Sequence, residues 1–301
     1  MPAHHAFWPK RLPYQLTAPQ TSLWMNLQIS ALRYPQKVAL VFMGRTWTYS
    51  QLQFEAEKIA SALRKMGVKK GDRVVLDMQN CPQLVITHFA ILRLDAVVVP
   101  VNPMNRTEEL KHYILDPDTK VAVTTADLAP ELAAASNALE KKERLQHLLV
   151  TQFTDAFDAA NIGPEELPET WSVWLKTVHA LPVIEDGQVH AWASALQGEV
   201  ELGPVTAQSE DLAVLPYTSG TTGLPKGCMH THGTIMHNAM SSGLWANGTP
   251  ENKCLCVVPM FHITGMVSVM HATIFMGATL ILMPRWDRDL AGRLISKWKV
   301  T

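Results

Sequence analysis

Residues 217–227 read Tyr-Thr-Ser-Gly-Thr-Thr-Gly-Leu-Pro-Lys-Gly. An apolar run at 212–215 precedes this stretch and predicts a strand, and a polar helical pattern begins near His230. Glycines let backbone N–H groups approach an anion closely, and consecutive N–H groups in such a turn form an anion-binding concavity. Because a strand enters this loop and a helix leaves it, we predict a phosphate-binding loop. Its further donors are the hydroxyls of Ser219, Thr221 and Thr222 and the ammonium of Lys226.

The spacing of this loop differs from that of the Walker A motif, G-x-x-x-x-G-K-S/T, because the fifth residue after Gly220 is Pro225. The stretch instead resembles the signature loop of the acyl-adenylate-forming enzymes, which include acyl-CoA synthetases, luciferases and the adenylation domains of peptide synthetases. Residues 259–265, Pro-Met-Phe-His-Ile-Thr-Gly, resemble the next motif of that family, an aromatic–His pair followed by glycine. The opening of the chain is most similar to bacterial long-chain fatty acid–CoA ligases. The resemblance runs from about Thr21, with one poorly matched stretch in the middle.

The resemblance implies a role for each residue of the two motifs. Thr218 matches the position whose hydroxyl helps to coordinate Mg²⁺. His262 matches the histidine near the junction of the substrate carboxylate and the α-phosphate, and a buried, hydrogen-bonded histidine is the alternative. Lys226 and His262 are therefore the predicted catalytic residues. The positions that hold the β- and γ-phosphates of ATP and the departing pyrophosphate are matched by Ser219, Gly220, Thr221, Thr222, Gly223 and Lys226.

By the same resemblance, a carboxylate attacks the α-phosphorus of ATP to give acyl-AMP and pyrophosphate, and the thiol of coenzyme A then displaces AMP. This chemistry needs positive charge and directed donors more than a covalent nucleophile. We therefore predict ATP-dependent activation of a fatty acid to acyl-CoA. A ligase for an aryl or short-chain acid stays open, as does a non-catalytic nucleotide-binding fragment, which is a different class of protein.

An apolar stripe at helical spacing follows His262, and it is either a core face or, by the resemblance, the border of an acyl tunnel. Its members are Ile263, Met266, Val267, Met270 and Ile274.

Composition and charge limit the class of protein. Of the 301 residues, 47% are hydrophobic and 18% charged, the balance of a soluble globular protein with a substantial core. The net charge of -1 gives no argument for nucleic acid as a partner, and four scattered cysteines do not make a disulfide framework. Residues 1–20 lack the apolar region of a secretory signal and predict an irregular arm.

The uncharged residues 254–284 are interrupted by Pro259, Gly265 and Gly277. They predict a buried βαβ unit rather than a membrane span. We therefore predict a cytoplasmic protein, for which peripheral membrane contact and oligomerisation stay open.

Strand and helix patterns alternate with short connections, which predicts a doubly wound α/β sheet. Thr48 and Gln51 have the spacing of a capping box, at the start of a helix that Gly67 ends. Further strands are predicted at 72–76, 96–101, 120–124, 145–151, 253–259 and 278–284. Further helices are predicted at 82–94, 107–115, 128–142, 230–244, 265–276 and 287–297.

Residues 152–209 break this rhythm and predict an irregular excursion with one short helix at 171–181. Residues 299–301 predict the first residues of another strand. We therefore expect residues 1–301 to form an incomplete N-terminal adenylation (AMP-binding) domain with layered, doubly wound sheets. The C-terminal lid domain would then be absent, and the residues for adenine, ribose, a second metal ligand and coenzyme A would lie beyond residue 301.

Overall fold

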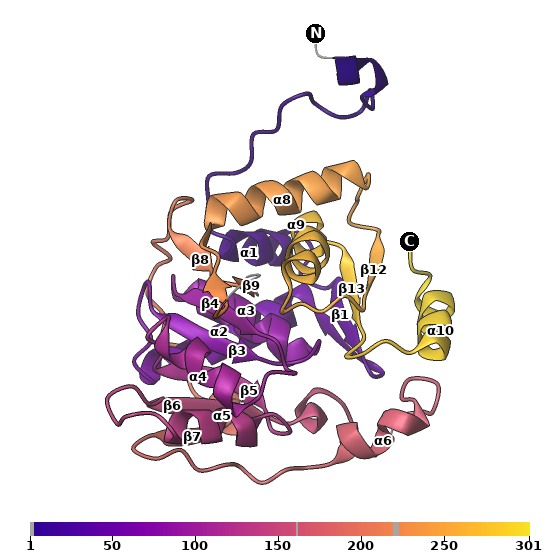
Figure 1. Ribbon diagram of the computed structural model, residues 1–301. Helices are drawn as coiled ribbons and strands as arrows, with labels where there is room; N and C mark the ends of the chain where they lie inside the picture. Colours follow the sequence, from indigo (N-terminus) through magenta and orange to yellow (C-terminus); the bar gives the residue numbers. More distant parts are fainter. Residues whose placement is uncertain (1–2, 161, 219–222) are drawn as a thin grey trace.

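The computed structural model describes residues 3–160, 162–218 and 223–301 (Figure 1). The strands are β1 (Val38–Phe42), β2 (Arg45–Thr48), β3 (Arg73–Asp77), β4 (Val97–Val101), β5 (Val121–Thr125), β6 (His147–Thr151), β7 (Gln188–Ala191), β8 (Leu212–Val214), β9 (Tyr217–Thr218), β10 (Lys226–Gly227), β11 (His230–Thr231), β12 (Lys253–Cys256) and β13 (Thr279–Leu282). The α-helices are α1 (Trp24–Arg33), α2 (Tyr49–Lys65), α3 (Pro82–Arg93), α4 (Thr107–Leu115), α5 (Ala129–Asn137), α6 (Glu169–Lys176), α7 (Trp192–Gln197), α8 (His232–Trp245), α9 (Ala272–Met276) and α10 (Arg288–Trp298). Two short 3-10 helices, η1 (Ala3–Phe7) and η2 (Phe153–Ala156), and a π-helix, η3 (Thr264–His271), complete the described elements.

The larger sheet has the order β11-β8-β4-β3-β5-β6-β7, and all of these neighbours are parallel except β11 and β8. Helices cover both of its faces. α4 and α5 pack on the face that carries Val75 and Val99, whereas α2 and α3 pack on the face that carries Val74 and Val98. The central strands are continuous runs of buried residues because neither face reaches water. The prediction of a doubly wound α/β sheet is confirmed.

The smaller sheet has the order β12-β13-β1-β2, with β12, β13 and β1 parallel and β2 antiparallel to β1. The connection from β12 to β13 runs through η3 and α9, so residues 254–284 form the predicted βαβ unit. Leu40 and Leu280 of this sheet belong to the same core as Val74 of the larger one, so the two sheets share one interior. Within the described residues, none of the helices is long and apolar enough to span a bilayer.

Local sequence signals set the ends of α2. The Thr48 side chain accepts the N–H of Gln51 at 3.2 Å, and the Gln51 side chain accepts the N–H of Thr48 at 2.8 Å. This capping box satisfies two donors that a helix start leaves unpaired. Gly67 follows the helix with φ of +93°, which a residue with a side chain rarely adopts.

Two predicted helices differ from the structure by more than two residues at one end. α5 ends at Asn137 rather than at residue 142, and the Arg144 side chain bonds to carbonyls at and after this end. Its Nε donates to the carbonyl of Leu139 at 3.0 Å, and its Nη2 donates to the carbonyl of Asn137 at 3.2 Å. These bonds satisfy carbonyls that the helix end leaves without an intrahelical donor. The helix predicted at 171–181 is α6, which begins and ends earlier.

Two predictions about irregular segments are wrong. Residues 188–191, inside the predicted excursion, form β7, which pairs in parallel with β6 and lies at the edge of the larger sheet. Residues 299–301 form no strand in the part of the chain that the structure describes. Lys299 has a left-handed backbone, with φ of 55°, that ends α10, and the N–H of Thr301 donates to the carbonyl of Lys253 at 3.1 Å.

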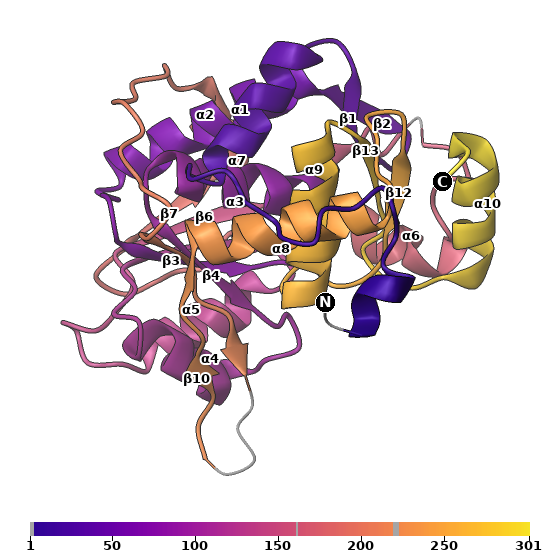
Figure 2. The same ribbon diagram turned by 90° about the horizontal axis from the view of Figure 1, so that it is seen from above.

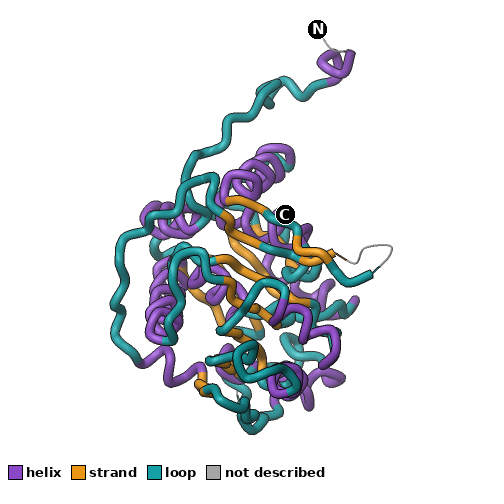
Figure 3. Tube along the Cα trace, turned by 60° about the vertical axis from the view of Figure 1, so that its left-hand side comes forward, coloured by secondary structure: helices purple, strands orange, loops and turns teal. Residues whose placement is uncertain are grey.

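The N-terminal residues form an arm that extends away from the body of the molecule (Figures 1 and 3). Arg11 ties the arm to the end of α8, because its guanidinium donates to the carbonyls of Leu244 at 2.6 Å and Trp245 at 2.7 Å. A cation at the C-terminal carbonyls of a helix is favoured by the helix dipole. Beyond the short helix η1, the arm is irregular, as predicted.

Candidate functional site

The phosphate-loop stretch lies on a β-hairpin. β9 and β10 pair antiparallel, and the hairpin projects from the body of the molecule (Figure 2). The chain then returns as β11, which pairs with β8, before α8 begins. The strand predicted at 212–215 and the helix predicted from 230 are confirmed as β8 and α8, and the three two-residue strands between them were not predicted. Since β8 is parallel to β4, the hairpin leaves the carboxyl edge of the larger sheet.

The helix α4 holds the base of this hairpin. The Tyr217 hydroxyl donates to the carboxylate of Asp116, and the Tyr217 ring centroid lies 4.7 Å from that of Tyr113. On the other strand, Nε2 of His112 donates to the carbonyl of Pro225 at 2.7 Å. Burial, together with the hydrogen bond to Asp116, raises the pKa of Tyr217, so its hydroxyl stays a donor at neutral pH. Both strands of the hairpin are thus fixed to one helix.

The hairpin brings two of the predicted site residues together. Thr218 and Lys226 are both exposed and lie opposite each other across β9 and β10. Gly223 has φ of +105°, a left-handed conformation that a side chain would strain. A hydroxyl and an ammonium therefore stand side by side where the predicted phosphate loop begins and ends. The other predicted phosphate contacts lie outside the described residues, and they are Ser219, Gly220, Thr221 and Thr222.

His262 lies on the turn between β12 and η3. It is exposed, so the alternative of a buried histidine is wrong. Its backbone N–H donates to the carbonyl of Pro259 at 3.2 Å, and its Nδ1 accepts the N–H of Thr264 at 3.3 Å. Because Nδ1 accepts, the neutral ring carries its proton on Nε2, which has no hydrogen-bond partner among the described residues. Within the same part of the chain, no hydrogen bond joins His262 to Thr218 or Lys226.

A pocket of about 590 Å³ opens beside Phe261, the residue before His262. It lies where β3 and β4 end. The chain leaves β3 for α3 on one face of the larger sheet, and it leaves β4 for α4 on the other face. Such a divergence at the carboxyl ends of neighbouring parallel strands opens a crevice in which ligands bind. The loops after β12 and β13 supply the opposite wall, and Met104, Phe261 and Trp286 make much of the lining apolar.

One cation at this pocket, Arg285, was not predicted from the sequence. Arg285 lines the pocket, its guanidinium lies 3.8 Å from the ring centroid of Trp174, and its Nε donates to Gln79 at 2.8 Å. Trp174 in turn donates from Nε1 to Asp127 at 2.8 Å. Trp174 of α6, within residues 152–209, therefore contacts a residue that lines the pocket. Its position in the sequence could have indicated a site residue, because Arg285 directly follows the strand predicted at 278–284.

The apolar stripe after His262 belongs to the core. Met266, Val267, Met270 and Ile274 are buried, and none of them lines this pocket. The structure therefore favours the core face over a tunnel border. The helix that carries the stripe begins with π-helical geometry, which the spacing did not predict and which recurs at functional sites.

Two other histidines near this segment are structural. His271 of η3 places Nε2 at 2.8 Å from Nε2 of His88 on α3, and Nδ1 of His232 accepts the N–H of Leu23 at 3.0 Å. Burial lowers the pKa of His271 to about 3 and that of His232 to about 4, so both rings are neutral at neutral pH. Across the residues that the structure describes, no group of three or more His, Cys, Asp or Glu side chains could hold a metal ion.

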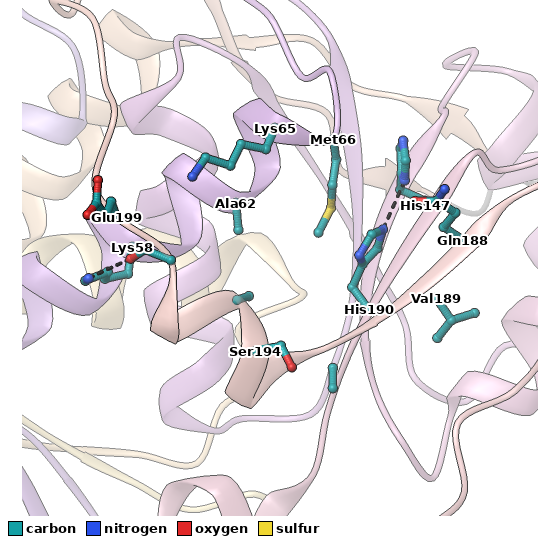
Figure 4. Close-up of a pocket in the computed structure, with 13 residues that line it drawn as sticks. Lys58, Ala62, Lys65, Met66, His147, Gln188, Val189, His190, Ser194 and Glu199 are labelled. Carbon is teal, nitrogen blue, oxygen red and sulfur yellow. Dashed lines mark hydrogen bonds between the residues drawn. The ribbon is translucent and has the colours of Figure 1, made fainter.

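A separate pocket of about 400 Å³ lies at the opposite edge of the larger sheet (Figure 4). His147, at the start of β6, and His190 of β7 line it and share a hydrogen bond of 3.0 Å between Nδ1 and Nε2. This is the amino edge of the parallel strands, whereas the hairpin leaves the carboxyl edge. The pocket is therefore not part of the candidate site.

Residues 27–301 match the family of AMP-binding enzymes, so the chain belongs to the class that its fold and its phosphate loop indicate. The resemblance to the acyl-adenylate-forming enzymes is thereby confirmed.

Two relatives and one solved structure are similar to most of the chain. The long-chain-fatty-acid–CoA ligase of Bacillus subtilis is 32% identical to this chain over 301 residues, which cover 98% of this chain and 52% of that protein. The 4-coumarate–CoA ligase 2 of Oryza sativa subsp. japonica is 29% identical over 86% of this chain and 42% of its own length. The inhibitor-bound N-terminal domain of FACL13 from Mycobacterium tuberculosis has a TM-score of 0.71 at 27% identity, over 93% of this chain and 61% of that one. The chain spans about half the length of the relatives it matches.

Proposed function

We propose that this chain is the N-terminal half of a fatty acid–CoA ligase, which activates the acid with ATP to acyl-AMP and passes the acyl group to coenzyme A. The observation that carries the proposal is the pairing of Thr218 with Lys226 on a hairpin at the same sheet edge as the pocket beside Phe261, the residue before His262. The relatives named above are acid–CoA ligases of about twice this length. The other half of the protein would supply the contacts to adenine and ribose and the lid. We also propose that the protein is cytoplasmic.

The hairpin would hold the triphosphate. Lys226 is exposed and would place a point charge on the pyrophosphate as it leaves, where negative charge accumulates. Thr218 would offer one hydroxyl oxygen to Mg²⁺. This ion usually binds few protein oxygens and completes its octahedron with water and phosphate oxygens, so a single exposed hydroxyl beside the phosphates fits it. When bound, Mg²⁺ would neutralise phosphate charge. The remaining phosphate contacts of the proposal are Ser219, Gly220, Thr221, Thr222 and Gly223.

His262 would orient the acid. With Nδ1 engaged by Thr264, its Nε2–H is free to donate to a carboxylate oxygen and to hold it toward the α-phosphorus. The apolar lining beside Phe261 suits an apolar chain. Both the acyl chain and the pantetheine arm of coenzyme A must reach the same carboxyl carbon, so either could occupy this pocket.

A second candidate is a ligase for an aryl acid, which the identity to a 4-coumarate–CoA ligase favours. Acid-dependent exchange of pyrophosphate into ATP by the full-length protein separates the candidates, with palmitate, octanoate, acetate, benzoate and 4-coumarate as substrates. We expect kcat/KM to be highest for a fatty acid, by about tenfold or more. If kcat/KM is highest for 4-coumarate or acetate, that acid and not a fatty acid is the substrate. If the protein binds ATP but exchanges pyrophosphate with none of the acids, it is a non-catalytic nucleotide-binding protein and not a ligase.

A further inference from the structure

The turn after β3 is bonded directly to the segment that carries His262. Asn80 in this turn is 2% exposed, and both ends of its side-chain amide are used. Nδ2 donates to the carbonyl of Val258 at 3.1 Å, and Oδ1 accepts the N–H of Met260 at 2.8 Å. One side chain of the larger sheet thus holds two backbone groups of the loop after β12, which belongs to the smaller sheet. A buried amide with both ends paired fixes the distance and the orientation of the two segments.

These two bonds flank the carbonyl on which His262 depends. Pro259 lies between Val258 and Met260, and its carbonyl accepts the N–H of His262 at 3.2 Å. The other side of this carbonyl is packed against Gly265, where a Cβ would lie only 2.3 Å from the oxygen. The backbone from Val258 to His262 therefore has little freedom while the Asn80 amide is in place.

The same turn also holds the second loop of the smaller sheet. Gln79, next to Asn80, accepts from Nε of Arg285, which follows β13. The turn at 79–80 thus joins the loops after β12 and β13 to the edge from which the hairpin leaves the larger sheet. The phosphate hairpin follows β8 of the larger sheet and His262 follows β12 of the smaller sheet, and this turn bonds the carboxyl edge of the larger sheet to the segment that carries His262.

We propose that Asn80 is a positioning residue, which sets the place of His262 relative to the phosphate hairpin through Val258 and Met260. The inference rests on the proposed function, in which His262 orients the carboxylate. A displacement of about 1 Å at a reacting group can lower a rate by about 10²-fold. Asn80→Ala would remove both bonds and leave the backbone groups of Val258 and Met260 without these partners.

A double-mutant cycle in the full-length protein tests the proposal. The single-turnover rate of acyl-AMP formation is measured for wild type, Asn80→Ala, His262→Ala and the double variant. We expect Asn80→Ala to slow the reaction by about 10²-fold when His262 is present and by less than about threefold when it is absent, because residues that act through one another are not additive. Equal losses in both backgrounds would overturn the proposal. Asn80→Asp, which keeps the acceptor for Met260 and loses the donor for Val258, should lie between wild type and Asn80→Ala.

Gln83→Ala is the matched control. Gln83 lies on the first turn of α3, is also 2% exposed, and makes a partly buried bond from Nε2 to the carbonyl of Gln152 at 2.9 Å, away from the His262 segment. Its loss of rate should be the same with and without His262.

Hydrogen exchange of the Met260 amide gives a second readout that does not depend on activity. We expect this amide to exchange at least about tenfold faster in Asn80→Ala than in wild type or Gln83→Ala. Unchanged exchange would overturn the proposal even if the rate fell. If His262→Ala keeps the wild-type rate, the role of His262 in the proposed function fails and positioning for catalysis fails with it. Hydrogen exchange of the Met260 amide then still shows whether Asn80 fixes the backbone from Val258 to His262.

Discussion

Replacing Gly265 with alanine tests the close packing of the His262 segment. A Cβ at this position would lie 2.3 Å from the carbonyl oxygen of Pro259 and 2.6 Å from that of Val258. An ordinary contact begins at 3.4 Å, so the Pro259 oxygen must retreat by about 1.1 Å. Both neighbours are backbone atoms, which cannot relieve the contact by changing a rotamer.

The displacement acts on stability and on the site at once. Overpacking a buried position costs about 1–3 kcal/mol, so we expect the free energy of unfolding to fall by about 2 kcal/mol in Gly265→Ala. Because the Pro259 carbonyl accepts the N–H of His262, a shift of about 1 Å reaches the candidate catalytic side chain. We expect pyrophosphate exchange by the full-length protein to fall by about 10²-fold.

Urea unfolding followed by circular dichroism measures the first effect, and exchange of labelled pyrophosphate measures the second. Gly292→Ala is the control, since this glycine lies on α10 with no atom within 4 Å of an added Cβ. Alanine forms helix better than glycine by about 1 kcal/mol, so the control should become more stable. A Gly265→Ala chain with wild-type stability and exchange would refute the steric argument.

Three further predictions follow from the same structure. Lys226→Ala should lower pyrophosphate exchange by about 10²-fold or more and leave thermal unfolding unchanged, because the lysine is exposed; exchange within about threefold of wild type would remove it from the site. Burial lowers the pKa of His271 to about 3, so between pH 6.5 and 3 the unfolded chain binds a proton that the folded chain does not, and stability falls as the pH falls. In His271→Gln the slope of unfolding free energy against pH should be shallower by up to about 1.4 kcal/mol per pH unit, and parallel slopes would contradict the assignment. Burial, and then Asp127, raise the pKa of Asp77, whose Oδ1 has no partner among the described residues, so ionising this carboxyl as the pH rises costs stability. Asp77→Asn should therefore be more stable than wild type at pH 8 by an amount that shrinks toward pH 5, and a variant less stable at pH 8 would show that the carboxylate is stabilised.

Periodic patterns with local end signals were sufficient for much of the fold. The helix at 107–115 has the predicted bounds, and α2 begins at the predicted capping box. In both cases the information lies within a few residues, because a cap is a contact between near neighbours in sequence. Buried parallel strands such as β4 were predictable for a similar reason, since burial on both faces requires a continuous apolar run.

The elements that were missed depend on distant partners. β7 reads Gln-Val-His-Ala, with no apolar run, and it is a strand because β6 offers it a ladder of hydrogen bonds. The strands of the hairpin have two residues each, too few for any periodicity. In the site, Lys226 was predicted from its residue type and Thr218 and His262 from the family resemblance, and their roles stay predictions. The bonds from Asn80 to a segment about 180 residues away have no counterpart in local sequence.

The order of strands in the smaller sheet has a consequence for synthesis. β1 lies between β2 and β13, and Leu40 pairs with Leu280, about 240 residues later. At a translation rate of about 5–20 residues per second, one side of β1 waits for roughly 10–50 s after it leaves the ribosome. Over this time β3, β4, β5 and β6 can already pair with one another, since they lie close together in sequence. The open side of β1 is meanwhile a template for pairing with the wrong strand or with another nascent chain. The newly made protein is therefore most vulnerable through one of its earliest strands, and that edge of β1 closes only after β13 has emerged.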